Sequence, residues 1–230
     1  MDKVADYFAT GVALGRKICN DPIFRRVFNW ENEMRNRVGL TAFATFAGVF
    51  LLYAVFMTGS ILAQTAIGGL TPASPQPGKG AAQGLAVEYI RILARHVDEI
   101  EVAGKGKPGE PISMLDWNVG DGPVLTHEDD DGVAARISGF IKFEAAGDYM
   151  MAIQSNDGVR LTIGGKLIID DPDVHMDRFS PNVTVQVPHA GWYPLYLLYF
   201  ERKGTATLEL YWQPPGADGF DFVPEEAFAH

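Results

Sequence analysis

Acidic side chains gathered in short runs are the residues of this sequence that could do chemistry. Residues 128–132, Glu-Asp-Asp-Asp-Gly, could collect a hard cation through carboxylate oxygens, and a solvated acidic loop is the alternative. Residues 170–175, Asp-Asp-Pro-Asp-Val-His, hold one histidine among three acids, which is too little for a zinc site without further ligands. The proline and the aspartates of this second run predict a loop at the rim of a binding face.

The sequence shows no catalytic arrangement. It contains no Gly-x-Ser-x-Gly nucleophile motif, no His-Glu-x-x-His zinc motif and no glycine-rich phosphate-binding loop. Carboxylate pairs are plentiful, but they single out no acid and base for glycoside cleavage. The histidines are scattered without metal-ligand spacing: His96, His127, His175, His189 and His230. We therefore expect that the protein is not an enzyme.

A long uncharged segment, residues 39–67, predicts one transmembrane helix. Its most apolar part, residues 40–62, would form a helix about 35 Å long, enough to cross a hydrocarbon core of about 30 Å. Arg35 and Arg37 precede the segment and the next basic residue is Lys79, so the positive-inside rule predicts a cytoplasmic N-terminus. The C-terminal part is then expected on the periplasmic side of a bacterial inner membrane. A cleaved signal peptide is the competing interpretation, but signal peptides have a shorter leading segment and a shorter apolar run than this sequence has.

The region before this helix, residues 1–38, has a loose helical periodicity and predicts a cytoplasmic amphipathic helical segment. Its aromatic residues could lie among lipid headgroups or contact a partner subunit. Small residues in the transmembrane segment would let a second helix approach closely. The candidate docking residues for the lipid bilayer or for integral membrane subunits are Phe24, Phe28, Trp30, Gly48 and Gly59.

Charge divides unevenly on the two sides of the predicted helix. The first 38 residues carry seven Lys and Arg against five acids, so the rest of a chain of net charge −10 carries −12. This acidic bulk argues against a nucleic acid partner. The one cysteine, Cys19, lies on the cytoplasmic side, so no disulfide framework holds the C-terminal part. Residues 68–83 are rich in Pro and Gly and predict a semi-extended linker.

From residue 84 to residue 230 the apolar residues alternate with a period of two, which is typical of half-buried strands. Gly164-Gly165 separates two such runs and predicts a tight hairpin. Residues 193–200 and 205–212 are expected to form a second hairpin across residues 201–204. Short strands at regular spacing, without an intervening helical pattern, predict an all-β antiparallel sandwich or barrel.

These strands resemble the protective-antigen (PA-14) domain, a β-sandwich of bacterial toxins, glycosidases and yeast adhesins. The similarity covers about residues 84–228 and follows the order of the family's strands. The segments that carry it are residues 84–89 (GLAVEY), 155–170 (SNDGVRLTIGGKLIID), 190–195 (AGWYPL) and 208–212 (LELYW). It says nothing about the first 80 residues.

The resemblance also implies a candidate calcium and sugar loop. In the sugar-binding members of the family, two adjacent aspartates joined by a cis peptide bind Ca²⁺, and the ion holds sugar hydroxyls. The matching dipeptide here is Asn156-Asp157, in which one carboxylate is replaced by a neutral amide. The second loop of those relatives corresponds to residues 201–204, which lack the relatives' asparagine ligand; Glu201 is the candidate residue of this loop, and Arg202 and Lys203 would repel a cation. We therefore expect no cofactor, with Ca²⁺ disfavoured, and turn chemistry is the alternative role of Asn156-Asp157.

Two noncatalytic functions remain open from the sequence. In the first, the protein is an accessory or structural subunit of a larger bacterial membrane complex, with its sandwich on the outer face of integral partners. In the second, it is a membrane-tethered lectin that binds a glycan with little or no calcium. The loss of one carboxylate at Asn156 favours the first function.

Overall fold

The structure is a computed structural model that describes residues 66–230. Almost all of the predicted transmembrane helix and the whole cytoplasmic segment lie outside the described residues. The same is true of the five candidate docking residues: Phe24, Phe28, Trp30, Gly48 and Gly59. Within residues 66–230, no helix has the length and apolar character needed to cross a membrane.

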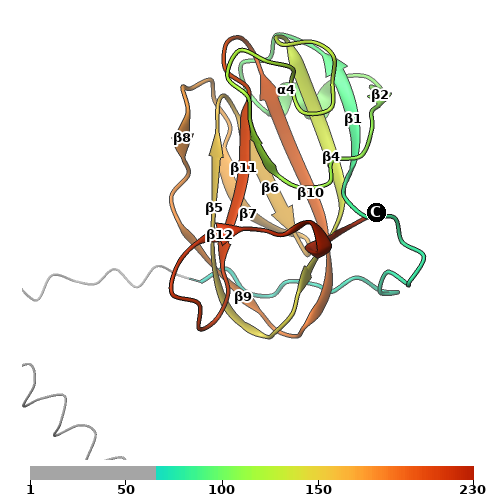
Figure 1. Ribbon diagram of the computed structural model, residues 1–230, viewed down its shortest axis with the longest axis vertical. Coiled ribbons are helices and arrows are strands. Elements are labelled where there is room, and N and C mark those ends of the chain that lie inside the picture. Colours follow the sequence, from blue (N-terminus) through green and yellow to red (C-terminus); the bar gives the residue numbers. More distant parts are fainter. Residues whose placement is uncertain (1–65) are drawn as a thin grey trace, which may run out of the picture. The chain divides into compact units, whose positions relative to one another are not determined.

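Two antiparallel sheets pack face to face (Figure 1). The first sheet has the order β2-β1-β4-β10-β6-β7, with β13 paired to β4. Its strands are β1 (Ala86–Arg91), β2 (Lys107–Pro108), β4 (Val133–Phe143), β6 (Val159–Ile163), β7 (Lys166–Asp171), β10 (Gly191–Glu201) and β13 (Phe228–Ala229). The expected all-β antiparallel sandwich is confirmed.

The second sheet has the order β12-β11-β5-β8, with β3 paired to β11 and β9 paired to β5. Its strands are β3 (Asp116–Asn118), β5 (Gly147–Ser155), β8 (Arg178–Phe179), β9 (Val183–Val187), β11 (Thr207–Gln213) and β12 (Asp221–Phe222). Two short helices complete the described part of the chain: α4 (Asp98–Val102) and the 3₁₀ turn η2 (Glu225–Ala227).

The core lies between the two sheets because alternate residues of each long strand point inward. β4 and β10 pair along their whole length, from Gly191 opposite Phe143 to Glu201 opposite Val133. Aromatic rings close one end of the core, where Phe143 lies 4.8 Å from Tyr149 and 5.5 Å from Tyr193 between ring centroids. The alternation predicted from the sequence therefore corresponds to burial between two sheets.

One of the two expected hairpins is present in the structure. β6 and β7 are joined by Gly164 and Gly165, which both have positive φ, 57° and 76°, as a type I′ turn requires. The second expected hairpin is wrong, because β10 belongs to the first sheet and β11 to the second. β10 already has β4 on one edge and β6 on the other, so the chain can only continue into the opposite sheet.

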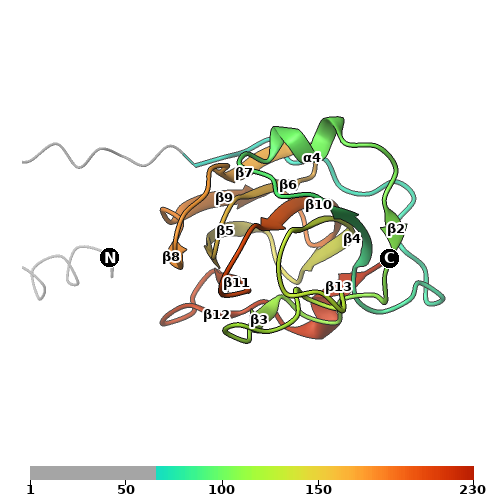
Figure 2. The same cartoon turned by 90° about the horizontal axis from the view of Figure 1, so that it is seen from above.

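The segment expected as a linker, residues 68–83, is extended but packs on the sandwich. We call residues 66–76 the N-terminal strap; it crosses the sandwich end opposite α4 (Figure 1) and, seen from above, passes on the side of β7 and β9 (Figure 2). Ile67 donates a backbone hydrogen bond of 2.8 Å to Thr184 in β9, and Leu70 is 3 % exposed. The compact unit therefore begins before residue 84, because the strap adds backbone pairing and an apolar side chain to the core.

Candidate functional site

The acidic runs of the sequence meet at one end of the sandwich, the end at which α4 lies (Figure 1). Here the β5–β6 turn contacts two other loops through Asp157. The Asp157 N–H donates to the carbonyl of His175 at 2.9 Å, and the Arg202 N–H donates to the Asp157 carboxylate at 2.7 Å. The loop before β4 joins them, since the Gly132 N–H donates to the carbonyl of Arg202. Loops far apart in the sequence thus form one surface.

Asn156 and Asp157 hold the loops of this surface together through hydrogen bonds. Asp157 has a positive φ of 58°, and its two carboxylate oxygens accept from the N–H groups of His175 and Arg202. The side-chain amide of Asn156 donates to Thr205 Oγ1 at 2.8 Å. Burial raises the pKa of Asp157, although the hydrogen bonds from Arg202 and His175 oppose the shift. The peptide bond between the two residues is trans, unlike the cis bond that the family resemblance implies.

Glu201 ends β10 in a fully buried position. Its Oε2 accepts from the Tyr199 hydroxyl at 3.5 Å, and its Oε1 has no hydrogen-bond partner. Burial, together with the negative charges of Asp157, Asp131 and Asp177, raises the pKa of Glu201 to about 8. The side chain is therefore a neutral carboxylic acid at pH 7.

These residues do not fit a calcium site. Both carboxylate oxygens of Asp157 are already hydrogen-bonded, Glu201 is protonated at neutral pH, and Asn156 supplies no charge. Calcium prefers several ionised carboxylate or carbonyl oxygens around one point. Across residues 66–230, no group of three or more His, Cys, Asp or Glu side chains is placed to hold a metal ion.

The two acidic runs are likewise engaged within the chain. In the first, Asp129 pairs with Arg91 at 2.7 Å, and Asp131 accepts from the Gly204 N–H at 2.9 Å. In the second, Asp171 pairs with Arg178. These carboxylates hold the loop end together, and neither run gathers oxygens around a cation.

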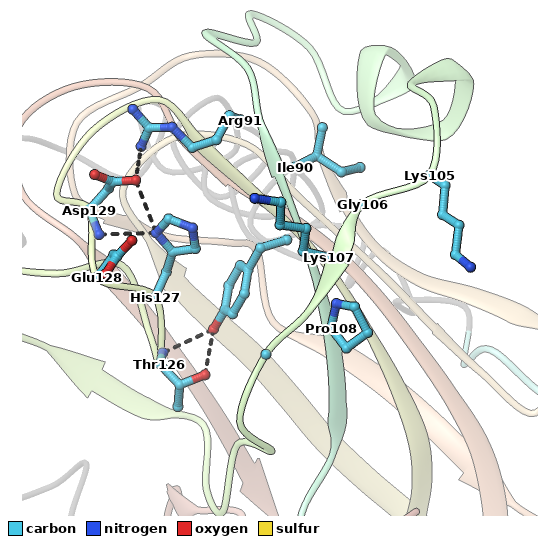
Figure 3. Close-up of a pocket in the computed structure, with 12 residues that line it drawn as sticks. Ile90, Arg91, Lys105, Gly106, Lys107, Pro108, Thr126, His127, Glu128 and Asp129 are labelled. Carbon is cyan, nitrogen blue, oxygen red and sulfur yellow. Dashed lines mark hydrogen bonds and ion pairs between the residues drawn. The ribbon is translucent and has the colours of Figure 1, made fainter.

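A recess of about 720 Å³ opens beside this loop end (Figure 3). Its walls are the end of β1, the segment that contains β2 and the loop before β4. The lining residues are Tyr89, Ile90, Arg91, Lys105, Gly106, Lys107, Pro108, Gly109, Thr126, His127, Glu128 and Asp129. The Arg91 guanidinium joins it to the rest of the surface by donating to the carbonyl of Asp131 at 2.8 Å.

Strand pairing sets which side chains face the recess. Lys107 lies directly opposite Tyr89 in the antiparallel β1–β2 pair, so the two side chains share one face of that pair. Arg91 follows Tyr89 by two residues and shares the same face. Gly109 lets the lysine segment approach β1, because a Cβ there would lie 2.3 Å from the Tyr89 ring. In Figure 3, Lys107 extends across the recess and Lys105 points away from it.

The loop opposite β1 places His127 against this face. Its ring lies 4.9 Å from the Tyr89 ring in an edge arrangement, and its Nδ1 accepts from the Asp129 N–H at 3.0 Å. A neutral imidazole whose Nδ1 accepts carries its proton on Nε2, so Nε2 is a donor. The Tyr89 hydroxyl is held by Thr126, at 2.8 Å from its Oγ1.

Comparison with known proteins assigns the family of this part of the chain. Residues 122–226 match the PA14 domain family, so this region is a PA14 domain, and the sandwich has a PA14-like fold. No curated protein sequence matches the chain.

Solved structures share the fold at low sequence identity. An anti-sigma factor domain-containing protein from Clostridium clariflavum is 22 % identical, with a TM-score of 0.51 over 64 % of this chain and 46 % of its own. A PA14 sugar-binding domain from an RTX adhesin is 15 % identical, with a TM-score of 0.53 over 65 % of this chain and 99 % of its own. The epithelial adhesin 6 A domain from Candida glabrata, in complex with Galβ1-3GlcNAc, is 11 % identical, with a TM-score of 0.54 over 70 % and 92 %. At these identities the likeness establishes the fold alone.

Sequence reasoning found the loop end and missed the recess. It brought together Asn156, Asp157 and Glu201, which the structure does place at one end of the sandwich. The recess depends on Tyr89 and Lys107, which are 18 residues apart and meet only through β1–β2 pairing. The available signal was the Lys-Gly-Lys-Pro-Gly run at 105–109, in which glycines alternate with cations.

Proposed function

We propose that the protein is a noncatalytic carbohydrate-binding module that does not depend on calcium, tethered to a bacterial inner membrane by residues 39–67. The observation that carries the proposal is the recess at the loop end of a PA14 sandwich. Its lining combines hydroxyl, imidazole, cationic and carboxylate groups beside the Tyr89 ring, which is itself buried. These polar groups suit the hydroxyl groups of a sugar.

Two further observations support this function. The structural relatives include a domain described as sugar-binding and an adhesin domain in complex with a disaccharide. The loop that would hold calcium in such relatives is filled here by internal hydrogen bonds of Asn156 and Asp157. A glycan held by this chain therefore relies on protein side chains instead of a metal ion.

The test is retention of the full-length chain, in nonionic detergent, on a panel of immobilised oligosaccharides and polysaccharides. We expect at least one glycan to retain the chain equally well with calcium and with a chelator. Glu128→Trp should abolish retention by obstructing the recess, because Glu128 lies at its rim (Figure 3). Glu144→Trp is the matched control, since this side chain is 74 % exposed and does not line the recess. Retention that needs calcium, or that survives Glu128→Trp, would contradict the proposal.

A second candidate function, an accessory subunit of a membrane complex, is favoured by an aromatic strip on the second sheet. The strip consists of Phe179, Tyr211 and Phe222, with ring centroids 5.5 Å and 4.5 Å apart. Tyr211 alternates with two buried residues of β11, so it faces away from the core, and Phe179 is 57 % exposed. Exposed apolar surface of this kind marks protein contact sites.

This second function predicts that the strip and the membrane segment together hold the partners. Phe179→Ser should release co-purifying membrane proteins, whereas Leu167→Ser should not, because Leu167 is 49 % exposed but lies outside the strip. Replacement of residues 1–66 by an unrelated signal anchor should also release the partners if Phe24, Phe28, Trp30, Gly48 and Gly59 dock on them. Partners that are retained after both Phe179→Ser and the anchor replacement would rule out this docking.

A further inference from the structure

The recess presents an excess of hydrogen-bond donors in a strongly acidic domain. Lys107 forms no ion pair among the described residues, and its ammonium lies on the same face as Arg91. His127 adds a donor through Nε2, because its Nδ1 is occupied by the Asp129 N–H. Of the two carboxylates in the lining, Asp129 is already paired with Arg91 at 2.7 Å, which leaves Glu128 at the rim.

We propose that this recess selects a glycan that carries an anionic group, such as the carboxylate of a uronic acid. This inference rests on the proposed function and adds to it the charge of the sugar. The ammonium of Lys107, the imidazole of His127 and the remaining guanidinium N–H groups of Arg91 donate to the anion.

The backbone around Lys107 is fixed before any ligand arrives. Gly106 and Gly109 pack directly on β1, where a Cβ would lie 2.4 Å from the Tyr89 carbonyl oxygen and 2.3 Å from the Tyr89 ring. Arg91 is held by Asp129 and by the carbonyl of Asp131. Because these groups are already placed, little backbone order has to be created when the anion binds.

The charge of the whole chain makes this selection testable. Residues after 38 carry a net charge of −12, so a polyanion is repelled by most of the surface and gains nothing from nonspecific attraction. Binding of an acidic polymer therefore requires a local site with donors. Selection of an anionic sugar would also distinguish this recess from the calcium loop of the sugar-binding relatives, because the matching loop of this chain does not fit calcium.

The experiment compares two polymers that differ only at the sugar carboxyl, which is ionised in one and methyl-esterified in the other. Full-length chain in nonionic detergent is immobilised, and binding of polygalacturonate is measured against its fully methyl-esterified form. We expect polygalacturonate to bind at least about tenfold more tightly, the scale of one charged hydrogen bond. Dextran sulfate against dextran repeats the comparison with sulfate, and so identifies which anion the donors prefer.

Matched lysine variants locate the effect. Lys107→Gln should lower the affinity for polygalacturonate about tenfold and leave the affinity for the esterified polymer unchanged, whereas Lys107→Arg should retain most of the affinity. Lys166→Gln removes the same charge from an exposed lysine of β7 that does not line the recess, so the affinity of this variant should stay close to that of the natural chain. Tryptophan fluorescence confirms that each variant is folded.

Several outcomes would overturn the inference. Equal losses in Lys107→Gln and Lys166→Gln would indicate a general charge effect. If the charged and esterified polymers bind equally and Glu128→Trp weakens the binding of both, anion selection is refuted. Carbohydrate binding at the recess is then still supported. Failure to bind any glycan, charged or neutral, would instead refute the proposed function itself.

Discussion

Replacing Glu201 with Gln tests whether a buried carboxylic acid remains protonated at neutral pH. The carboxyl is fully buried at the end of β10, and burial together with neighbouring negative charges raises its pKa from 4.5 to about 8. Gln has the same shape and no charge, so it reproduces the protonated state at every pH. The variant should therefore lose the part of the pH dependence that belongs to Glu201.

The sign follows from proton binding. Between pH 4.5 and about 8 the folded chain keeps the Glu201 proton and the unfolded chain loses it, so the free energy of unfolding falls as pH rises. Each pH unit in this window corresponds to about 1.4 kcal/mol. From pH 6 to pH 9, Glu201 should thus remove about 3 kcal/mol from the stability of the natural chain, a loss that Glu201→Gln avoids.

The assay is urea denaturation of residues 63–230 at pH 6, 7, 8 and 9, followed by tryptophan fluorescence. The readout is the difference in unfolding free energy between the variant and the natural sequence at each pH, because an unpaired Gln amide adds a cost that does not change with pH. Glu144→Gln, on an exposed side chain, should show a constant difference. A constant difference for Glu201→Gln as well would refute the protonated carboxyl, since an ionised Glu201 would titrate alike in both states.

Three further predictions concern calcium, the strap and the topology. Millimolar Ca²⁺ should leave the melting temperature of residues 63–230 nearly unchanged, because a ligand stabilises only in proportion to RT ln(1 + [L]/Kd); a large rise abolished by Asp157→Ala would restore the calcium site. Leu70→Ala should lower the free energy of unfolding by about 2–5 kcal/mol, as expected for a buried leucine. Leu167→Ala should lower it far less, because Leu167 is half-exposed. Equally small losses in both variants would show that the strap is a free linker. Protease added to cells with a permeabilised outer layer should digest the sandwich and leave Cys19 inaccessible to impermeant thiol reagents; labelling of Cys19 from outside would reverse the predicted orientation.

Local pattern was enough to predict the class of fold. The alternation in runs such as residues 133–143 reflects the twofold period of a strand, and Gly164-Gly165 specifies its turn through backbone conformation alone. The Asn156-Asp157-Gly158 turn is also a local feature. These predictions hold because each depends on residues that are neighbours in the sequence.

Pairing between distant segments decided the rest. The sequence could not show that β10 has both edges occupied, so the expected hairpin with β11 becomes a crossing between sheets. Nor could the sequence show that the Leu70 side chain is buried in the core, because a Pro- and Gly-rich segment has the same composition whether it is free or packed.

The chemistry of the site depends on the same distant contacts. Glu201 is an ordinary acid in the sequence, and its pKa is raised only because the fold buries it and brings Asp157, Asp131 and Asp177 near it. The recess arises because β1–β2 pairing places Lys107 beside Tyr89 and Arg91, opposite His127 from another loop. The sequence by itself determined the strands and their turns, whereas burial, charge proximity and the recess were decided by the tertiary structure, since each is a property of residues that the fold brings together.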